Sequence, residues 1–315
     1  MAAPVSAASA TGRTSHLLHR RDEIELEPAL PDHSRGLTRA VLVGEATGSV
    51  HTGLILVELE DGYVDTHVHS FESSFFVLEG EPVLYLDGRG IRLRPNACGA
   101  VPVGMPHAWR SDGRARWIEM ASPRPRPPQQ PPDTFFLGAA PEDPPAELDL
   151  RDPRNRHLFL LADDDMDVAG LSRGMPSSEP KVSASMATAA LLYSGITVKM
   201  LVDKRLDAQL HTMFMVGYQP GAQALPHDHP FEESYYMLEG EVDVVADGTR
   251  YALHPGDVFW TAVGCVHAFY ETKGGTVQWL ETSAPGPPPR HSYRHQRDWE
   301  YLGERLAAET SVGAA

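Results

Sequence analysis

The sequence contains one stretch twice, and this repeat decides the fold. HVHSFESSFFVLEGE occupies residues 67–81 and HDHPFEESYYMLEGE occupies residues 227–241, so the two copies are offset by 160 positions. The same offset relates His107 to His267. Self-similarity at one fixed offset indicates an internal duplication. We therefore predict that the chain consists of two copies of one domain.

Proline-rich segments mark the ends of the repeated regions. Residues 124–128 and 287–289 are rich in proline, which cannot continue a central strand or a helix interior. We expect five parts along the chain: a mobile N-terminal segment (1–36), an N-terminal domain (37–125), a Pro-rich and acidic connector (126–188), a C-terminal domain (189–286), and a C-terminal tail (287–315) with a short helix at 299–308.

Short β-type runs and turn signals fill both copies. Asp-Gly pairs follow such runs at Asp61-Gly62, Asp87-Gly88 and Asp247-Gly248, and this dipeptide favours tight hairpin turns. Glycine and proline number 27 each, which favours short strands and turns over long helices. We predict an all-β fold with two tandem barrels of the jelly-roll kind.

The composition excludes several classes of protein. Hydrophobic residues make up 42% of the 315 residues, enough to form a core, and no apolar run reaches the ~18–20 residues of a membrane-spanning helix. The net charge of −16 argues against a nucleic-acid partner, which requires a basic face. The chain has only two cysteines and no signal-peptide pattern, so we expect a cytoplasmic protein without a disulfide framework.

The second copy places three histidines and a glutamate in the pattern of a metal site. His227 and His229 are two positions apart, so on a strand they point to the same face, and Glu233 has the same parity. His267 follows one hairpin later. Three imidazoles and a carboxylate form a common ligand set for a divalent transition metal with positions left open for substrate. We expect Fe or Mn, with Ni, Cu or Zn as alternatives.

The first copy carries a less complete version of this pattern. His67, His69 and His107 repeat the three histidines, but Ser73 stands where the second copy has its glutamate. The adjacent Glu72 points to the other face of a regular strand, and only a bulge would turn it inward. Two interpretations remain open: a second, three-histidine metal site, or a decayed copy that is retained for packing.

Both copies resemble domains of the cupin superfamily. The first motif of that family is matched at every spacing by Gly221, His227, His229, Glu233 and Gly240. The second motif is matched by Gly256, Gly264 and His267, with Ala262 where proline is usual. The resemblance covers both repeats and implies a bicupin, a chain of two tandem cupin domains that binds metal in the second.

Among bicupins, the layout is most similar to that of ureidoglycine aminohydrolases. The similarity rests on segments 211–213, 219–221, 238–240 and 256–260. That family carries Glu, His, His and Gln at the ligand positions where this chain has three histidines and a glutamate. A Tyr-Lys pair that ends its last strand is also missing, because this chain has residues 279–282 (Trp-Leu-Glu-Thr) there. The resemblance therefore implies a related scaffold and leaves the substrate open.

Further side chains are candidates for catalysis or for the substrate pocket. Tyr235 shares the face of Glu233, and Glu281 lies at a strand end where it could act as a general base. The candidates for substrate binding are His211, which repeats His51, and the aromatic residues Trp260, Phe269 and Trp279. Two more residues are ambiguous: Cys265 is either a metal neighbour or a small core residue, and Arg110 is either a carboxylate-binding or a solvated side chain.

These features predict a metal-dependent bicupin enzyme that acts on a small polar organic molecule, most simply an oxidoreductase of dioxygenase type. One alternative is a hydrolase or lyase related to ureidoglycine aminohydrolase. Another is a non-catalytic cupin that binds a small ligand. We expect a homo-oligomer with a small-molecule substrate and with neither nucleic acid nor membrane as a partner.

Overall fold

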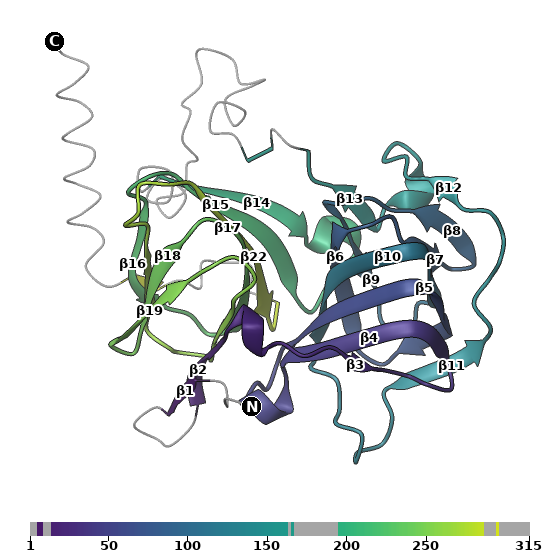
Figure 1. Ribbon diagram of the computed structural model, residues 1–315, viewed down its shortest axis with the longest axis horizontal. Coiled ribbons are helices and arrows are strands. Elements are labelled where there is room, and N and C mark those ends of the chain that lie inside the picture. Colours follow the sequence, from purple (N-terminus) through teal and green to yellow (C-terminus); the bar gives the residue numbers. More distant parts are fainter. Residues whose placement is uncertain (1–4, 9–13, 163–164, 167–194, 287–293, 296–315) are drawn as a thin grey trace, which may run out of the picture.

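Two β-barrels lie side by side in the computed structural model (Figure 1). The structure describes residues 5–8, 14–162, 165–166, 195–286 and 294–295. Helical structure in these ranges is limited to 3₁₀ turns at Arg21–Glu23, Glu45–Thr47, Pro153–Asn155 and Lys204–Leu206. None of the described helices is long and apolar enough to cross a membrane. The predicted all-β fold with two tandem barrels is confirmed.

The N-terminal barrel is built from a single sheet of eleven strands. Its strands are β3 (Glu27–Pro28), β4 (Ser34–Val43), β5 (Gly53–His69), β6 (Glu72–Glu79), β7 (Val83–Leu86), β8 (Arg89–Arg92), β9 (Ala97–Val101), β10 (His107–Ser122), β11 (Thr134–Gly138), β12 (Ala146–Glu147) and β13 (Leu158–Leu160). The long antiparallel pair β5 and β10 connects the two layers, because β10 pairs with β6 near one end and with β7 near the other.

The C-terminal barrel is divided into sheets of seven and five strands. Its strands are β14 (Ile196–Val202), β15 (Thr212–Tyr218), β16 (Gln223–Asp228), β17 (Glu232–Glu239), β18 (Val242–Ala246), β19 (Thr249–Leu253), β20 (Val258–Thr261), β21 (His267–Tyr270), β22 (Val277–Ala284) and β23 (Arg294–His295). The division arises because residues 219–221 (Gln-Pro-Gly) interrupt the counterpart of β5. Proline cannot donate to the ladder, and Gly221 has a φ of 77°.

Residues outside the repeated regions add strands to both barrels. The segment expected to be mobile contributes β1 (Val5–Ala8) and β2 (Thr14–His19), and β2 pairs with β20 of the C-terminal barrel. The connector contributes β11, β12 and β13 to the N-terminal barrel. The backbones of both segments thus pair with strands of the repeats. The helix expected at 299–308 lies outside the described residues.

Two of the three Asp-Gly pairs form the expected hairpin turns. Asp87-Gly88 joins β7 to β8 and Asp247-Gly248 joins β18 to β19, with positive φ at both residues of each turn. Asp61-Gly62 instead lies inside β5, beside a shift in the register between β5 and β10. Here the pair produces an irregularity within one long strand, because the barrel continues to pair on both sides of it.

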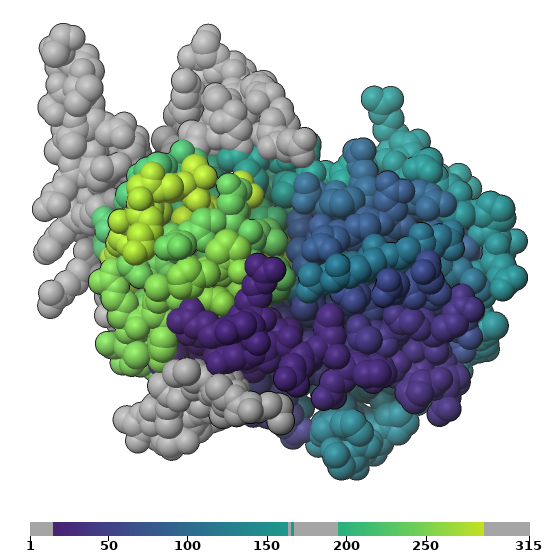
Figure 2. Space-filling model, viewed as in Figure 1, coloured from purple at the N-terminus to yellow at the C-terminus, as the bar shows by residue number. Residues whose placement is uncertain are grey.

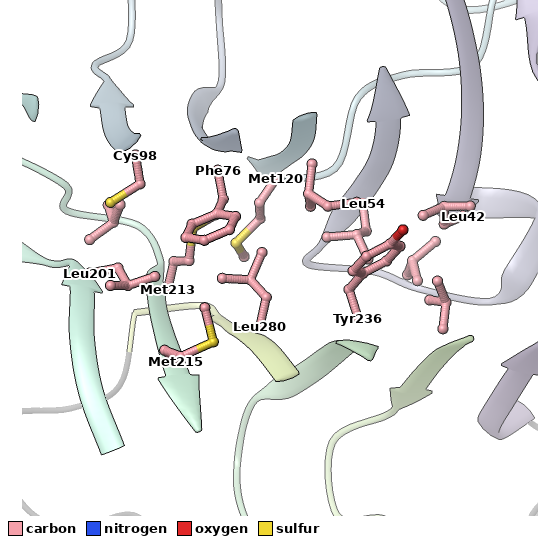
Figure 3. Packing of buried hydrophobic residues seen from close by; sticks show 14 of the residues in the cluster. Leu42, Leu54, Phe76, Cys98, Met120, Leu201, Met213, Met215, Tyr236 and Leu280 are labelled. Carbon is pink, nitrogen blue, oxygen red and sulfur yellow. The ribbon is translucent and has the colours of Figure 1, made fainter. Parts of the chain in front are cut away.

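A hydrophobic core fills the contact between the barrels (Figure 3). Leu54, Phe76 and Met120 of the first barrel face Met213 and Leu280 of the second. These side chains occupy the outward faces of strands whose alternate residues fill the barrel interiors. The two domains consequently share a buried interface, and the N-terminal segment lies across the second barrel in the space-filling view (Figure 2).

Two buried glutamates fasten the barrels to each other in a reciprocal way. Glu232 accepts hydrogen bonds from the backbone N–H groups of residues 50–52, at 2.8–3.1 Å, and from Ser49 Oγ at 2.7 Å. Its repeat partner Glu72 accepts from the backbone N–H groups of residues 209–210, at 2.8 and 2.9 Å. Each barrel thus supplies one carboxylate to the loop that precedes the long strand of the other barrel.

This contact corrects the equivalence of His51 and His211. His211 bonds Ser74 Oγ across the interface at 2.8 Å, and the residue that approaches Ser234, the repeat partner of Ser74, is Thr52. The structural counterpart of His211 is therefore Thr52, one position away from His51. The sequences of the two loops align at an offset of 160 residues. The strands that follow them, β5 and β15, occupy equivalent places beside β10 and β22 at an offset of 159 residues.

Candidate metal centres

The C-terminal barrel gathers its three predicted histidine ligands. His227 lies on β16, His229 follows this strand directly, and His267 begins β21, where it stands opposite His227. All three rings are buried, and one nitrogen of each lies within 4.8 Å of the others. The imidazoles therefore converge on one face, as the spacing of His227 and His229 predicts.

Backbone carbonyls orient the three rings. The Nδ1-to-oxygen distances are 2.7 Å from His227 to Leu225, 2.8 Å from His229 to Phe231 and 3.0 Å from His267 to Cys265. A neutral imidazole that donates from Nδ1 carries its lone pair on Nε2. The backbone therefore selects the tautomer that turns a metal-binding nitrogen toward the centre.

Glu233 adds a carboxylate to this group from β17. Its Oε2 lies 2.6 Å from Nε2 of His229 and 3.6 Å from Nε2 of His267, and its Oε1 accepts a hydrogen bond from Ser283 at 3.2 Å. Burial raises the pKa of Glu233, but the two histidines outweigh burial and hold this pKa well below its usual range. Glu233 is consequently an anion inside the barrel.

Two more buried groups surround Glu233. The Tyr235 hydroxyl donates to Oε2 of Glu233 at 2.5 Å and lies 3.1 Å from Nε2 of His267. Glu281 accepts a hydrogen bond from Nε1 of Trp279 at 2.9 Å. Burial, followed by the charge of Glu233, raises the pKa of Glu281 well above its usual range. The two neighbouring carboxyl groups therefore have pKa values that are shifted in opposite directions.

The donor set fits a divalent transition metal. Burial lowers the pKa of His227 to about 3, so this imidazole is neutral and able to donate its lone pair. Burial also lowers the pKa of His229, but Glu233 outweighs it and the net pKa is raised. A metal cation at the point where the imidazoles converge would balance the negative charge of Glu233.

The N-terminal barrel contains a second convergent triad. His67 on β5 stands opposite His107 on β10, and one nitrogen of each lies within 4.8 Å of the others and of one nitrogen of His69. Nδ1 of His67 faces the carbonyl of Asp65 at 2.7 Å, and Nδ1 of His107 faces that of Met105 at 3.0 Å. Burial lowers the pKa of His67 to about 4 and that of His107 to about 3. This geometry can hold a metal ion through three neutral imidazoles.

The fourth ligand of the second centre has no counterpart in the first. Ser73 occupies the place of Glu233, and Phe75 occupies that of Tyr235. Glu72 points away from the triad, as strand parity predicted, and lies in the contact between the barrels. The first centre therefore lacks the anionic group that characterises the second.

Arg39 gives the first centre a positive group instead. It lies on β4 two positions after Leu37, a residue of the barrel core, so the two side chains share the inward face. Its Nε is buried and has no hydrogen-bond partner among the described residues. After burial and neighbouring histidines, the charge of Arg39 further lowers the pKa of His69. In the second barrel the residue equivalent to Arg39 is Val198 of β14, which pairs with Val216.

A strand from the connector covers the first centre. β11 pairs with the end of β5 so that Thr134 lies opposite His69 and Phe136 opposite His67. Oγ1 of Thr134 lies 3.0 Å from Nδ1 of His69. In the second centre the corresponding partner of Nδ1 of His229 is a backbone carbonyl. The ring of Phe136 lies 5.4 Å from that of His67. The connector thus completes the N-terminal centre.

Phe269 and Trp279 lie inside the C-terminal barrel, where both are part of the hydrophobic core, and their role as pocket walls stays a prediction. Their rings stack at 5.2 Å, and Phe269 also lies 5.0 Å from the ring of Tyr235. Trp260 differs from the expectation, because Phe259 and not Trp260 faces the barrel core. Trp260 packs in the core between the barrels, which is the opposite face of the same strand.

His211 and Arg110 lie away from the sites considered for them, and Cys265 lies in the core, one of its two predicted locations. His211 contacts Glu72 at 3.0 Å and Ser74 in the interface between the barrels, so it is not a pocket residue. Arg110 donates to the carbonyls of residues 140–141 and not to the first centre. Cys265 supports His267 through its carbonyl, and its thiol is buried among core residues.

The residues that sequence reasoning missed are Arg39, Thr134 and Ser283. Ser283 has the parity of Glu281, so its inward direction could have been read from the sequence. Arg39 and Thr134 had no such signal, because neither the strand β4 nor the connector carries a family motif. Their positions depend on which strands pair with β5.

Two tandem barrels with a histidine triad in each define a bicupin. The cupin domain profile matches residues 55–121 and 214–283, one stretch within each barrel. The chain thus contains two cupin domains, and the predicted membership of the cupin superfamily is confirmed.

The chain is also similar to several characterised proteins. It is 24% identical over 248 residues to quercetin 2,3-dioxygenase of Bacillus subtilis (strain 168), with 72% of this chain and 71% of that protein covered. Among solved structures, a putative glyoxylate-induced protein from Pseudomonas aeruginosa has a TM-score of 0.60 at 16% identity, over 94% of this chain and 96% of that chain. Oxalate decarboxylase of Lactobacillus farciminis in its formate complex has a TM-score of 0.57 at 15% identity, over 90% and 89%. At these identities the two structures support the fold.

Proposed function

We propose that this bicupin is a metal-dependent oxidoreductase of dioxygenase type, with its reaction centre in the C-terminal barrel. The observation that carries the proposal is the geometry of one buried group, in which three imidazoles converge, Glu233 contacts His229, and Glu281 is held by Trp279. A divalent metal, Fe or Mn, bound there would supply Lewis acidity and redox chemistry. The similarity to a quercetin dioxygenase supports the same class of reaction.

The protein side chains divide the remaining work between them. Burial and the charge of Glu233 raise the pKa of Glu281, which favours a role as a general acid toward a developing oxyanion, and Trp279 fixes its orientation through Nε1. The Tyr235 hydroxyl bridges Glu233 and His267 and can hydrogen-bond a substrate oxygen. The stacked rings of Phe269 and Trp279 exclude water beside these groups. We propose a small, oxygenated organic molecule as the substrate, because these groups combine hydrogen-bonding oxygens with aromatic rings.

The N-terminal centre supports a second role, the binding of a small organic acid. Its three neutral imidazoles can hold a second metal, and Arg39 of β4 stands where β14 has Val198. Guanidinium groups pair with carboxylates in a bidentate manner. We assign this centre to an anionic ligand.

The test is an oxygen-consumption assay on protein loaded anaerobically with Fe(II) or Mn(II). A panel of flavonols, catechols, diketones and hydroxy acids is offered to the wild type and to the variants Glu281→Gln and Glu79→Gln. We expect oxygen uptake with one substrate class for the wild type and for the control variant Glu79→Gln. Glu79 is an exposed residue at the end of β6 in the N-terminal barrel. Glu281→Gln should lower kcat by about 10²–10⁴-fold.

The alternatives give other results in the same experiment. Ammonia release from ureidoglycine without oxygen uptake would indicate the hydrolase or lyase alternative. A raised melting temperature with a ligand and no turnover of any compound would indicate a binding protein. Elemental analysis of protein purified without added metal identifies the resident ion. We place the protein in the cytoplasm, which is consistent with its two free, buried cysteines.

A further inference from the structure

We propose that the C-terminal barrel contains a third metal site, for Zn²⁺, formed by His16, Asp247 and Cys265. One ligand atom of each residue lies within 4.8 Å of the others. This cluster is separate from both histidine triads, shares no residue with them, and combines three different donor types. It is independent of the proposed oxidoreductase reaction.

The three residues come from parts of the chain that are far apart in sequence. His16 lies on β2, which pairs with β20 at Thr261. Asp247 is in the tight turn between β18 and β19, and Cys265 lies just before β21. Only the addition of the N-terminal strand to the second barrel brings His16 to the other two, so the cluster is a product of this pairing.

Burial of two of the donors argues for a built site. His16 is 0% exposed and Cys265 is 3% exposed, whereas Asp247 at the turn is exposed. Nδ1 of His16 lies 3.0 Å from Ser15 Oγ and Nε2 lies 2.9 Å from the hydroxyl of Tyr251. One of these hydroxyls can hold the ring while the other turns away from the nitrogen that binds the ion.

The donor chemistry selects the ion. Imidazole nitrogen, thiolate sulfur and carboxylate oxygen are the three protein donors that Zn²⁺ accepts, with water in the fourth tetrahedral position. The Cys265 thiol loses its proton to solvent when the ion binds, and the ion's charge offsets the burial that otherwise disfavours a thiolate. Mn²⁺ prefers oxygen and imidazole donors and would not compete well for the thiolate.

Such an ion would fasten the N-terminal strand to the barrel beside the C-terminal centre. The carbonyl of Cys265 lies 3.0 Å from Nδ1 of His267, so the loop that holds the third ion also orients a ligand of the C-terminal triad. The proposed role of the zinc is therefore structural, as a clamp on this loop and on β2.

Titration of the full-length apoprotein with Co²⁺, as a spectroscopic substitute for Zn²⁺, tests the site. Sulfur-to-cobalt charge transfer gives a near-ultraviolet band that histidine triads cannot produce. We expect the band in the wild type and in Cys98→Ser, which alters the other buried cysteine, and its loss in Cys265→Ser. Zn²⁺ should displace the Co²⁺ and abolish the band.

A second variant guards against a folding defect at Cys265. Asp247→Asn changes an exposed turn residue and should weaken Zn²⁺ binding by about tenfold, or about 1.4 kcal/mol. Absence of the band in the wild type, its persistence in Cys265→Ser, or equal Zn²⁺ affinity in Asp247→Asn and wild type would each overturn the proposal. None of these outcomes bears on oxygen consumption, so the proposed reaction is tested separately.

Discussion

Arg39 is the residue that most clearly separates the chemistry of the two triads. It shares the inward face of β4 with Leu37, and its buried Nε has no hydrogen-bond partner among the described residues. Where the first barrel has this cation the second has Val198, and where the second has the anion Glu233 the first has Ser73. The duplicated scaffold therefore presents opposite charges beside two similar sets of imidazoles.

The variant Arg39→Met should weaken binding of a carboxylate at the N-terminal centre. We expect the Kd for oxalate to rise about tenfold, because a charge-assisted hydrogen bond contributes about 1.5–3 kcal/mol and each 1.4 kcal/mol is a factor of ten. Calorimetric titration of Mn²⁺-loaded protein measures this. Arg39→Lys should recover part of the affinity. Arg35→Met, on the exposed part of the same strand, should leave the Kd unchanged, and an unchanged Kd in Arg39→Met as well would rule out this role.

The two triads should differ in metal affinity because only one of them has a carboxylate. His227→Ala removes a ligand of the centre that contains Glu233, and it should lower the bound Mn²⁺ by about one equivalent. His67→Ala should lower it less, since a site of three neutral imidazoles binds Mn²⁺ more weakly and is less occupied in the wild type. Elemental analysis after loading and desalting gives both numbers. Equal losses in the two variants would show that the ranking of the sites is wrong.

At the scale of residues, the sequence predicts ligands better than it predicts pocket walls. Parity along a strand placed His227, His229 and Glu233 on one face, because the side-chain period of a strand is fixed. It also placed Glu72 on the other face. Trp260 could not be assigned in the same way, because its β-run has aromatic residues on both faces and both faces are buried, one in the barrel and one between the barrels.

At the scale of elements, β11 is a strand that the repeat pattern does not contain. It comes from the connector, pairs antiparallel with β5, and carries the threonine that bonds His69. A sequence can show that such a segment has β propensity, but the edge with which it pairs depends on strands more than sixty residues away. For the same reason the sequence does not predict that β2 pairs with β20.

The variant Thr134→Val should selectively weaken metal binding in the first centre. It keeps the shape of the side chain on β11 but removes the oxygen that lies 3.0 Å from Nδ1 of His69. Loss of such a partner commonly lowers metal affinity by about 10–100-fold, and we expect about tenfold. Mn²⁺ binding is measured by electron paramagnetic resonance in the His227→Ala background, which isolates the first centre.

A matched control lies on the same strand pair. Thr66 donates to the carbonyl of Ala139 at 3.0 Å and contacts no imidazole of the triad through that bond. Thr66→Val therefore removes one hydrogen bond between β5 and the residue that follows β11. It leaves the contact between Thr134 and the metal-ligand candidate His69 unchanged. If both threonine variants weaken Mn²⁺ binding equally, β11 acts by general ordering of the edge and not through His69.

At the scale of the whole molecule, the two barrels share one buried interface. The hydrophobic core between them takes residues from both repeats (Figure 3), and the carboxylates of Glu72 and Glu232 each bind the loop of the opposite barrel. The repeat made the two domains predictable. Their mode of contact could not be predicted, because the packing of one barrel on another depends on the shapes of two surfaces and leaves no local pattern in the sequence. We expect a single cooperative unfolding transition.

Glu72 should make the stability of this interface depend on pH. Burial raises the pKa of Glu72. The contact with His211 and the hydrogen bonds from the backbone N–H groups of residues 209–210 lower this pKa by more, so in the folded state it lies below its ordinary value of 4.5. A carboxylate with a depressed pKa stabilises the fold above its unfolded-state pKa, and this contribution disappears as the pH falls through the folded-state pKa. The wild type should therefore lose stability in acid through this group.

The variant Glu72→Gln tests this dependence, since an amide does not titrate. At pH 7 it should lower the free energy of unfolding by about 2 kcal/mol, because hydrogen bonds to a charged acceptor contribute about 1.5–3 kcal/mol. The difference from the wild type should shrink steadily as the pH falls below 4.5, as measured by urea unfolding. Glu147→Gln, at an exposed glutamate, should stay within about 0.5 kcal/mol throughout. A difference that persists undiminished into acid would mean that Glu72 acts through packing alone, and the charge on the carboxylate would then have no part in holding the barrels together.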